Sequence, residues 1–125
     1  MKIDIHTETE RGDILTLAED HTETWHGRTF TVPAGFESDG VSTPRFLWTT
    51  ISPKVHPQTI RGGLDHDWLY REQPEGWTRK DADQLFFDVI REDGFSPVRA
   101  RLAYTGLRLF GSKAWNENRR LKNHD

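Results

Sequence analysis

The chain has 125 residues, of which 34% are hydrophobic, so it is long enough for one domain and too short for two. Its formal net charge of -3 argues against a broad basic surface for nucleic acid. It contains no cysteine, which excludes disulfides and thiolate nucleophiles and favours a reducing compartment. Its N-terminus lacks the apolar segment of a signal peptide, and no apolar run approaches the roughly 20 residues of a membrane span. We therefore expect a soluble protein that is not secreted by a signal peptide.

Strands are expected in the first third of the chain. Residues 3–5 alternate between apolar and polar side chains, which is typical of a strand with one buried face. The pair His26-Gly27 separates two further runs, 22–25 and 28–32, and predicts a hairpin turn between them. The pattern indicates a small antiparallel sheet.

A polar loop follows at residues 36–44. The pair Asp39-Gly40 is a turn signal, so one interpretation is a tight turn stabilised by the Asp39 side chain. A second interpretation is a cation loop, in which Asp39 gives one hard oxygen and carbonyls near Gly40 give others. The sequence leaves both open.

A first helix is expected from about residue 57 to residue 71. Its buried face would carry apolar residues at four-residue spacing, namely Ile60, Leu64 and Trp68. The pair Gly62-Gly63 in its interior costs roughly 1 kcal/mol per glycine relative to alanine. We expect another backbone or a ligand to approach closely there.

Two further helices have clear start and stop signals. Thr78, followed by Asp81, resembles a capping box and precedes an apolar stripe that ends at Gly94. Ser96-Pro97 would begin a third helix, whose apolar residues up to Gly111 are Val98, Leu102, Leu107, Leu109 and Phe110. The sequence thus predicts an α+β fold: a small N-terminal antiparallel β-sheet, then two or three helices. We expect one domain over residues 1–112 and a polar C-terminal tail over residues 113–125 that frays.

The segment 64–71, with the sequence LDHDWLYR, concentrates side chains that carry chemistry. In a helix, residues four apart share a face, so His66 and Tyr70 would point together while Asp67 points elsewhere. A histidine that acts as a base usually needs a carboxylate on one ring nitrogen to fix its tautomer. This carboxylate must come from another element, and Asp83, at the edge of the next helical stripe, is the candidate.

Three motifs stand together in this chain: SDGVSTP at 38–44, His-Asp-x-x-Tyr at 66–70, and Ala-Asp-x-x-Phe at 82–86. Their combination resembles the small phage and prophage family of domain of unknown function thirteen fifty-three, over roughly residues 30–115. The resemblance implies a viral origin but no activity.

The order Asp39-Gly40-x-Ser42, His66-Asp67-x-x-Tyr70-Arg71 and Asp83-x-x-Phe86 is also similar, more distantly, to secreted phospholipase A-two enzymes of the bacterial and fungal type. This resemblance implies that His66 is the general base that activates water and that Asp83 orients its ring. Tyr70 would bond the same carboxylate. Asp67 would ligate calcium together with Asp39 and loop carbonyls near Gly40. Those enzymes join their helices by disulfides, which this chain lacks, and their spacing from histidine to second aspartate differs. Both departures weaken lipid as the substrate.

Structural interpretations of the same residues stay open. His66 could belong to a core polar network, Asp67 could pair with Arg71, and Asp83 could pair with Arg79. A metal set of the His-Asp phosphohydrolase type, with His56, His66, Asp67 and a later aspartate, fits poorly because such domains are all-helical.

Two hypotheses for function follow. The first is a phage-encoded, calcium-assisted hydrolase that acts on an ester or amide, with catalytic residues His66, Asp83 and Tyr70 and metal ligands Asp39, Gly40 and Asp67. Another divalent cation could replace calcium. The second is a non-catalytic virion or tail-accessory protein, bound to other phage structural proteins, in which the same residues form a structural network. We expect it in the host cytoplasm, the virion or both.

Overall fold

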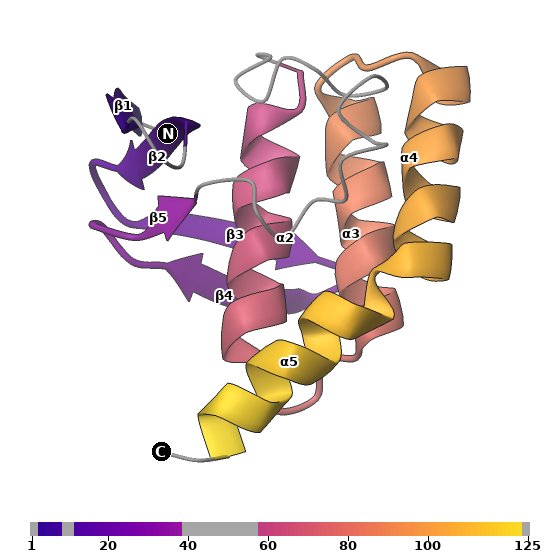
Figure 1. Ribbon diagram of the computed structural model, residues 1–125. Helices are drawn as coiled ribbons and strands as arrows, with labels where there is room; N and C mark the ends of the chain where they lie inside the picture. Colours follow the sequence, from indigo (N-terminus) through magenta and orange to yellow (C-terminus); the bar gives the residue numbers. More distant parts are fainter. Residues whose placement is uncertain (1–2, 9–11, 39–57, 124–125) are drawn as a thin grey trace. The chain divides into compact units, whose positions relative to one another are not determined.

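A computed structural model describes residues 3–8, 12–38 and 58–123. The chain divides into two compact units, residues 1–41 and 42–125. The described parts of the first unit form strands and those of the second form helices (Figure 1). The predicted α+β class is therefore confirmed, while the single domain over residues 1–112 stays a prediction.

The first unit contains a three-stranded antiparallel sheet. Its central strand is β2 (Gly12–Leu17), which pairs with β1 (Ile3–Glu8) on one side and with β5 (Glu37–Ser38) on the other. Leu15 and Leu17 on β2 are both buried, as alternation along a half-buried strand requires.

The predicted hairpin is the second part of this unit. It consists of β3 (His21–Trp25) and β4 (Arg28–Val32), paired from His21 opposite Val32 to Trp25 opposite Arg28. The two turn residues, His26 and Gly27, both have positive φ angles, 52° and 77°. This is the backbone that a two-residue type I′ turn needs to match the twist of its strands.

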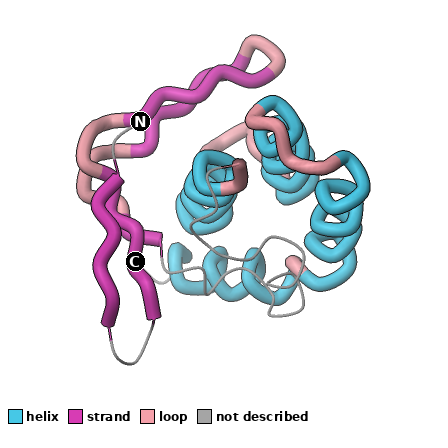
Figure 2. Tube along the Cα trace, turned by 90° about the horizontal axis from the view of Figure 1, so that it is seen from above, coloured by secondary structure: helices cyan, strands magenta, loops and turns pink. Residues whose placement is uncertain are grey.

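The second unit contains four described helices: α2 (Ile60–Glu72), α3 (Arg79–Glu92), α4 (Pro97–Phe110) and α5 (Ser112–Asn123). The first three run up and down beside one another, with α3 between α2 and α4, as Figures 1 and 2 show from two directions. α5 turns away from the end of α4 and packs on α2. This arrangement brings side chains from α2, α3 and α4 to one place.

The helix starts follow the sequence signals. The Thr78 hydroxyl accepts a bond from the Asp81 amide at 3.1 Å, and the Asp81 carboxylate accepts one from the Thr78 amide at 3.1 Å. The predicted capping box is therefore confirmed, and it fixes where α3 begins. Ser96 caps α4, with Pro97 in its first turn, as predicted.

α2 starts later than expected, at Ile60, and is buried over more than one stripe. Leu64 is buried as predicted, but Ile60 and Trp68 are only partly buried, while Leu69 and Tyr70 are fully enclosed. α2 packs against α3 and α5 at once, so a single apolar row does not describe its buried surface.

Another backbone or a ligand was expected to approach the glycine pair, but at Gly62 the closest approach is made by a side chain of α3, and the Phe86 carbonyl would lie 3.5 Å from an added Cβ atom. A Cβ atom there would lie 2.8 Å from Cγ2 of Ile90 on α3, a distance at which one of the two must move. At Gly63 no atom lies within 4 Å of such a Cβ. Gly62 therefore allows α2 and α3 to lie close together, which is the contact that carries the site.

The predicted apolar stripe of α4 was largely wrong. Leu107 is buried, but Val98, Leu102, Leu109 and Phe110 are exposed, and the core contact is made by small residues, including Ala100 and Ala103. Short side chains let α4 lie close to α3. Phe86 and Ile90 of α3, with Phe95 from the connection between the two helices, complete a buried cluster with them. Volume, and not hydrophobicity alone, selects the face that packs.

The C-terminal tail does not fray as expected, because its residues form α5 up to Asn123. Trp115 is buried, and its ring meets that of Tyr70 edge to face, with centroids 5.2 Å apart. Buried Gln73, which ends α2 in the left-handed region (φ 44°), donates side-chain bonds to the carbonyls of Tyr70 at 3.0 Å and Trp115 at 2.8 Å. α5 is thereby fastened to the end of α2.

Candidate functional site

The site begins with two side chains one turn apart on α2. His66 and Tyr70 share a face, as their spacing predicts, and their ring centroids are 4.2 Å apart. Phe86 on α3 meets the edge of the His66 ring at 5.4 Å. The imidazole is thus held between two aromatic rings and retains 4% of its accessible surface.

Asp83 on α3 reaches both of these side chains. Nε2 of His66 lies 2.8 Å from Oδ1 of Asp83, and the Tyr70 hydroxyl donates to the same oxygen at 2.7 Å. The structure therefore brings together the three residues that the sequence singled out as catalytic candidates. Because a carboxylate only accepts hydrogen bonds, Nε2 carries the proton in this contact. Within the described part of the chain, it is the one hydrogen bond of the His66 side chain. In the neutral form of a ring protonated on Nε2, Nδ1 holds the lone pair.

Two arginines hold the second oxygen of Asp83. Arg108 on α4 donates from Nη1 to Oδ2 at 2.8 Å, and Arg79, one turn before Asp83 on α3, approaches it at 3.4 Å. Arg79 also donates to the carbonyls of Leu107 at 2.9 Å and Arg108 at 3.2 Å, near the end of α4. Asp83 is therefore the point at which three helices are joined, and its own exposure is 0%.

This environment decides the ionisation of Asp83 and Tyr70. Burial alone raises the pKa of Asp83, but the bonds from His66, Tyr70 and Arg108 outweigh it and leave the pKa below its ordinary value. The pKa of Tyr70 is strongly raised, first by burial and then by the neighbouring Asp83 carboxylate. Asp83 is thus a fixed anion and Tyr70 a neutral donor at neutral pH.

The predicted metal ligands are only partly placed. Asp39 and Gly40 lie outside the described residues. Asp67 is buried on α2, and its Oδ2 lies 3.3 Å from Nη2 of Arg71 one turn later, the pairing that the structural interpretation predicted. Calcium takes six to eight oxygen ligands, and one carboxylate beside a guanidinium does not make such a set. Calcium therefore stays a prediction.

Sequence reasoning missed Arg108 and Gly111. Arg108 belongs to a helix whose pairing with α3 was not predicted, so nothing local marked it. A Cβ at Gly111 would lie 2.6 Å from the Tyr70 hydroxyl and 2.6 Å from the Leu107 carbonyl. The glycine between two helices was a visible signal, but it was interpreted only as the end of α4.

The fold and this site define an α+β protein with a buried His–Asp pair in its helical half. The chain belongs to the family described as "Protein of unknown function (DUF1353)", whose model matches residues 15–107, more than half of the chain. The match includes His66, Tyr70, Arg79 and Asp83. No curated protein and no solved structure was found to match the chain. None of the helices in the described ranges has the length and apolarity needed to cross a membrane.

Proposed function

We propose that this protein is a hydrolase in which His66 is the general base. The observation that carries the proposal is the 2.8 Å contact between Nε2 of His66 and Oδ1 of Asp83, because it assigns the proton to Nε2 and leaves Nδ1 as a base. A water molecule at Nδ1 would lose its proton to the ring while it attacks the carbonyl of an ester or amide.

The surroundings of Asp83 support this role. When His66 takes up a proton, the ring becomes a cation, and the Asp83 carboxylate beside it stabilises the positive charge. Tyr70 and Arg108 hold the carboxylate from both oxygens, so the ring cannot rotate without losing its partner. A positioned base of this kind contributes typically about 10²- to 10⁴-fold to a rate.

We further propose that the protein is phage-encoded and acts in the host cytoplasm or in the virion. This expectation comes from the resemblance to the family named above, whose description states neither a function nor a source. The proposal includes calcium or another divalent cation, with Asp39, carbonyls near Gly40 and Asp67 as its ligands. It would polarise the substrate oxygen. Asp67 fits such a role only if Arg71 gives up its 3.3 Å contact.

The test is a set of p-nitrophenyl esters and anilides of increasing acyl length, offered to the wild type and to His66→Gln. The glutamine amide nitrogen can replace Nε2 as donor to Asp83, but glutamine offers no basic nitrogen. The proposal expects hydrolysis by the wild type and a loss of at least about 100-fold in the variant, with an unchanged melting temperature. Equal rates for the two proteins would refute the role of His66 as the general base. If the wild type hydrolyses none of the substrates, this result would count against an ester or amide hydrolase.

A second candidate is a non-catalytic virion or tail-accessory protein that binds other phage structural proteins. What favours it is the complete enclosure of Asp83, whose two oxygens accept bonds from α2, α3 and α4. In this case the network only holds the three helices together, so it contributes stability and no catalysis.

His66→Ala tests the structural candidate when it is compared with His66→Gln, and hydrolysis by the wild type separates the two candidates. The alanine variant removes a donor from the buried Asp83 carboxylate, which costs about 1–3 kcal/mol, whereas the glutamine variant keeps one. The structural candidate predicts that the melting temperature falls with alanine and that no hydrolysis is found in any variant. An unchanged melting temperature in His66→Ala would contradict it.

A further inference from the structure

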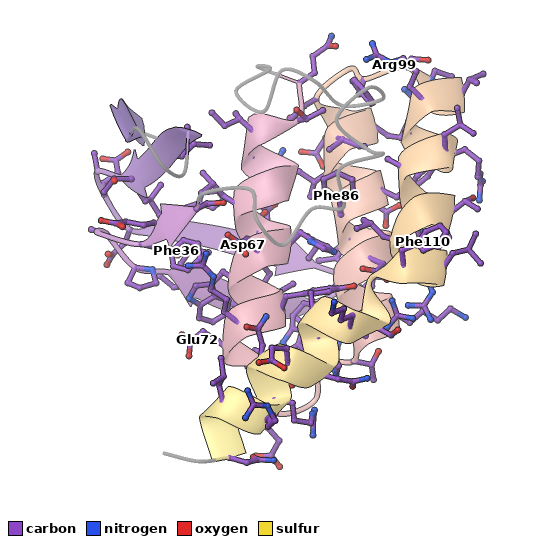
Figure 3. The ribbon with its side chains drawn as sticks, viewed as in Figure 1. Phe36, Asp67, Glu72, Phe86, Arg99 and Phe110 are labelled. Atoms are coloured by element: carbon purple, nitrogen blue, oxygen red, sulfur yellow. The ribbon has the colours of Figure 1, made fainter. Side chains whose placement is uncertain are left out.

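α4 presents a row of exposed apolar side chains. Val98 is 68% exposed, Leu102 56% and Leu109 67%. With exposed Thr105 they are spaced i, i+4, i+7 and i+11, which places them on one face of the helix. Exposed Phe110 lies at the end of α4 nearest α5 (Figure 3). Among residues 15–38 and 58–123, whose burial is described, large exposed apolar residues occur on α4 and α5 and on no other element.

The same two helices carry a positive charge that the rest of the chain lacks. α4 contains three arginines and no acidic residue. Residues 97–123 contain seven basic residues and one acidic residue, a net charge of +6, although the whole chain has a net charge of -3. Arg101 is next to Leu102, beside the apolar row, and its guanidinium is held over the Phe87 ring at 5.0 Å. A cation is therefore fixed at the edge of the row.

We propose that this face of α4, defined by Val98, Arg101, Leu102, Thr105 and Leu109, binds an acidic amphipathic helix of another protein. Side chains three and four apart form the ridges that pack into the grooves of a second helix. Carboxylates along the edge of the partner's apolar row would meet Arg101, and the net positive charge of residues 97–123 would attract an acidic partner. This binding proposal does not depend on the hydrolase activity proposed above.

The width and charge of the row decide between possible partners. Ala100, Ala103 and Leu107 of α4 are buried in the core, and exposed Phe110, which directly follows Leu109, points about 100° away from it, so one narrow row is available. A helix fits this width, whereas a helix that binds a lipid surface buries a broad apolar face. Nucleic acid would meet the cations but leave the apolar row uncovered.

A second copy of the chain fits less well. A symmetric pair places the same surface of both copies together, so the Arg101 edges of two α4 helices would face like charges and find no carboxylate. α4 has no acidic residue with which to compensate. The charge thus favours a different chain, and an acidic one.

The probe is a labelled, 18-residue synthetic helical peptide with leucines at i, i+4, i+7 and i+11 and glutamates on both edges. A matched peptide with lysines in place of the glutamates is the control. We expect the full-length protein to bind the glutamate peptide at least about tenfold more tightly than the lysine peptide, measured by fluorescence anisotropy, and the difference to shrink with added salt.

Variants of the protein test whether the peptide binds to this face of α4. Leu109→Ser should weaken binding about tenfold, whereas Leu121→Ser, at a leucine of α5 that is also exposed (52%) but lies outside the row, should not. Arg101→Glu should weaken binding about tenfold, whereas Lys80→Glu, the same charge change on exposed α3 surface, should not. Neither Leu109 nor Arg101 contacts His66 or Asp83. The melting temperature of Leu109→Ser should stay unchanged, and that of Arg101→Glu should fall slightly, because the variant loses the contact with the Phe87 ring.

Several results would overturn the proposal. One is equal binding of the two peptides by the wild type, which needs no variant to fold. A second is binding that Leu109→Ser and Leu121→Ser reduce equally. A third is Leu109-dependent sedimentation with phosphatidylglycerol vesicles without peptide binding, which would identify a lipid surface. A fourth is a dimer that Leu109→Ser dissociates, which would identify a second copy.

Discussion

Replacing Asp83 by asparagine removes the charge at the junction of three helices and keeps the shape of the side chain. The amide has one oxygen and one NH₂ group. If the oxygen keeps its contacts with His66 and Tyr70, the NH₂ group faces the guanidinium of Arg108, where Oδ2 accepted a bond at 2.8 Å. In the opposite orientation, the NH₂ group faces the two α2 donors. Either orientation leaves donors pointing at donors.

The magnitude follows from these contacts. Breaking a buried ion pair by removing one partner costs about 3–5 kcal/mol. The Arg108 side chain is 31% exposed, so water can hydrate its guanidinium once the anion is removed. The Arg79 contact is long at 3.4 Å, so its loss costs little. We therefore expect the lower end, about 3 kcal/mol in the free energy of unfolding.

Urea denaturation followed by far-ultraviolet circular dichroism measures this loss. With a slope of about 1.5 kcal/mol per molar urea, the midpoint should fall by about 2 M. Asp88→Asn is the matched control, because Asp88 is a partly buried aspartate on the same helix that accepts a bond from Gln84. It should cost less than about 1 kcal/mol. Equal losses in the two variants would refute the reasoning that Asp83 is the junction.

Three further predictions concern pH, close packing and cations. Because the pKa of Asp83 is lowered in the folded protein, its stabilising contribution is complete above the unfolded value of about 3.9 and is lost as the pH falls through the folded value. The difference between wild type and Asp83→Asn in urea should thus shrink from pH 7 to pH 3, and a constant difference would contradict this. Gly111→Ala should lower the free energy of unfolding by about 2 kcal/mol, because its Cβ would lie 2.6 Å from two oxygens. Gly63→Ala, with no atom within 4 Å, should raise it by up to about 1 kcal/mol, and thermal melts that rank the two variants otherwise would contradict the packing. Millimolar calcium should raise the melting temperature of the wild type but not of Asp67→Asn, with magnesium as the comparison; no rise in the wild type would count against calcium.

Local chemistry made much of this fold predictable. The His26-Gly27 turn and the Thr78–Asp81 capping box are each specified by residues within a few positions of one another. The four-residue spacing of His66 and Tyr70 is enough by itself to place both side chains on one face of a helix. The Asp83 partner was predictable because the spacing excluded Asp67.

The missed features depend on packing between distant segments. The contact of Arg108 with Asp83 spans 25 positions, and no local pattern marks it. The exposed row of α4 was misplaced because small residues, and not the larger ones, make the core contact. α5 was missed because its stability comes from Trp115 and Gln73 at the end of α2 and not from an apolar repeat of its own.

The most direct test concerns the proton on the His66 ring, and it needs no substrate. Nitrogen-15 NMR of histidine-labelled protein, with the His66 signals assigned by their loss in His66→Gln, reports which ring nitrogen is protonated in the neutral ring. The proposed base requires a proton on Nε2, bonded to Asp83, and a lone pair on Nδ1. A neutral ring protonated on Nδ1 would contradict it, because the lone pair would then point at a carboxylate and no base would remain for water.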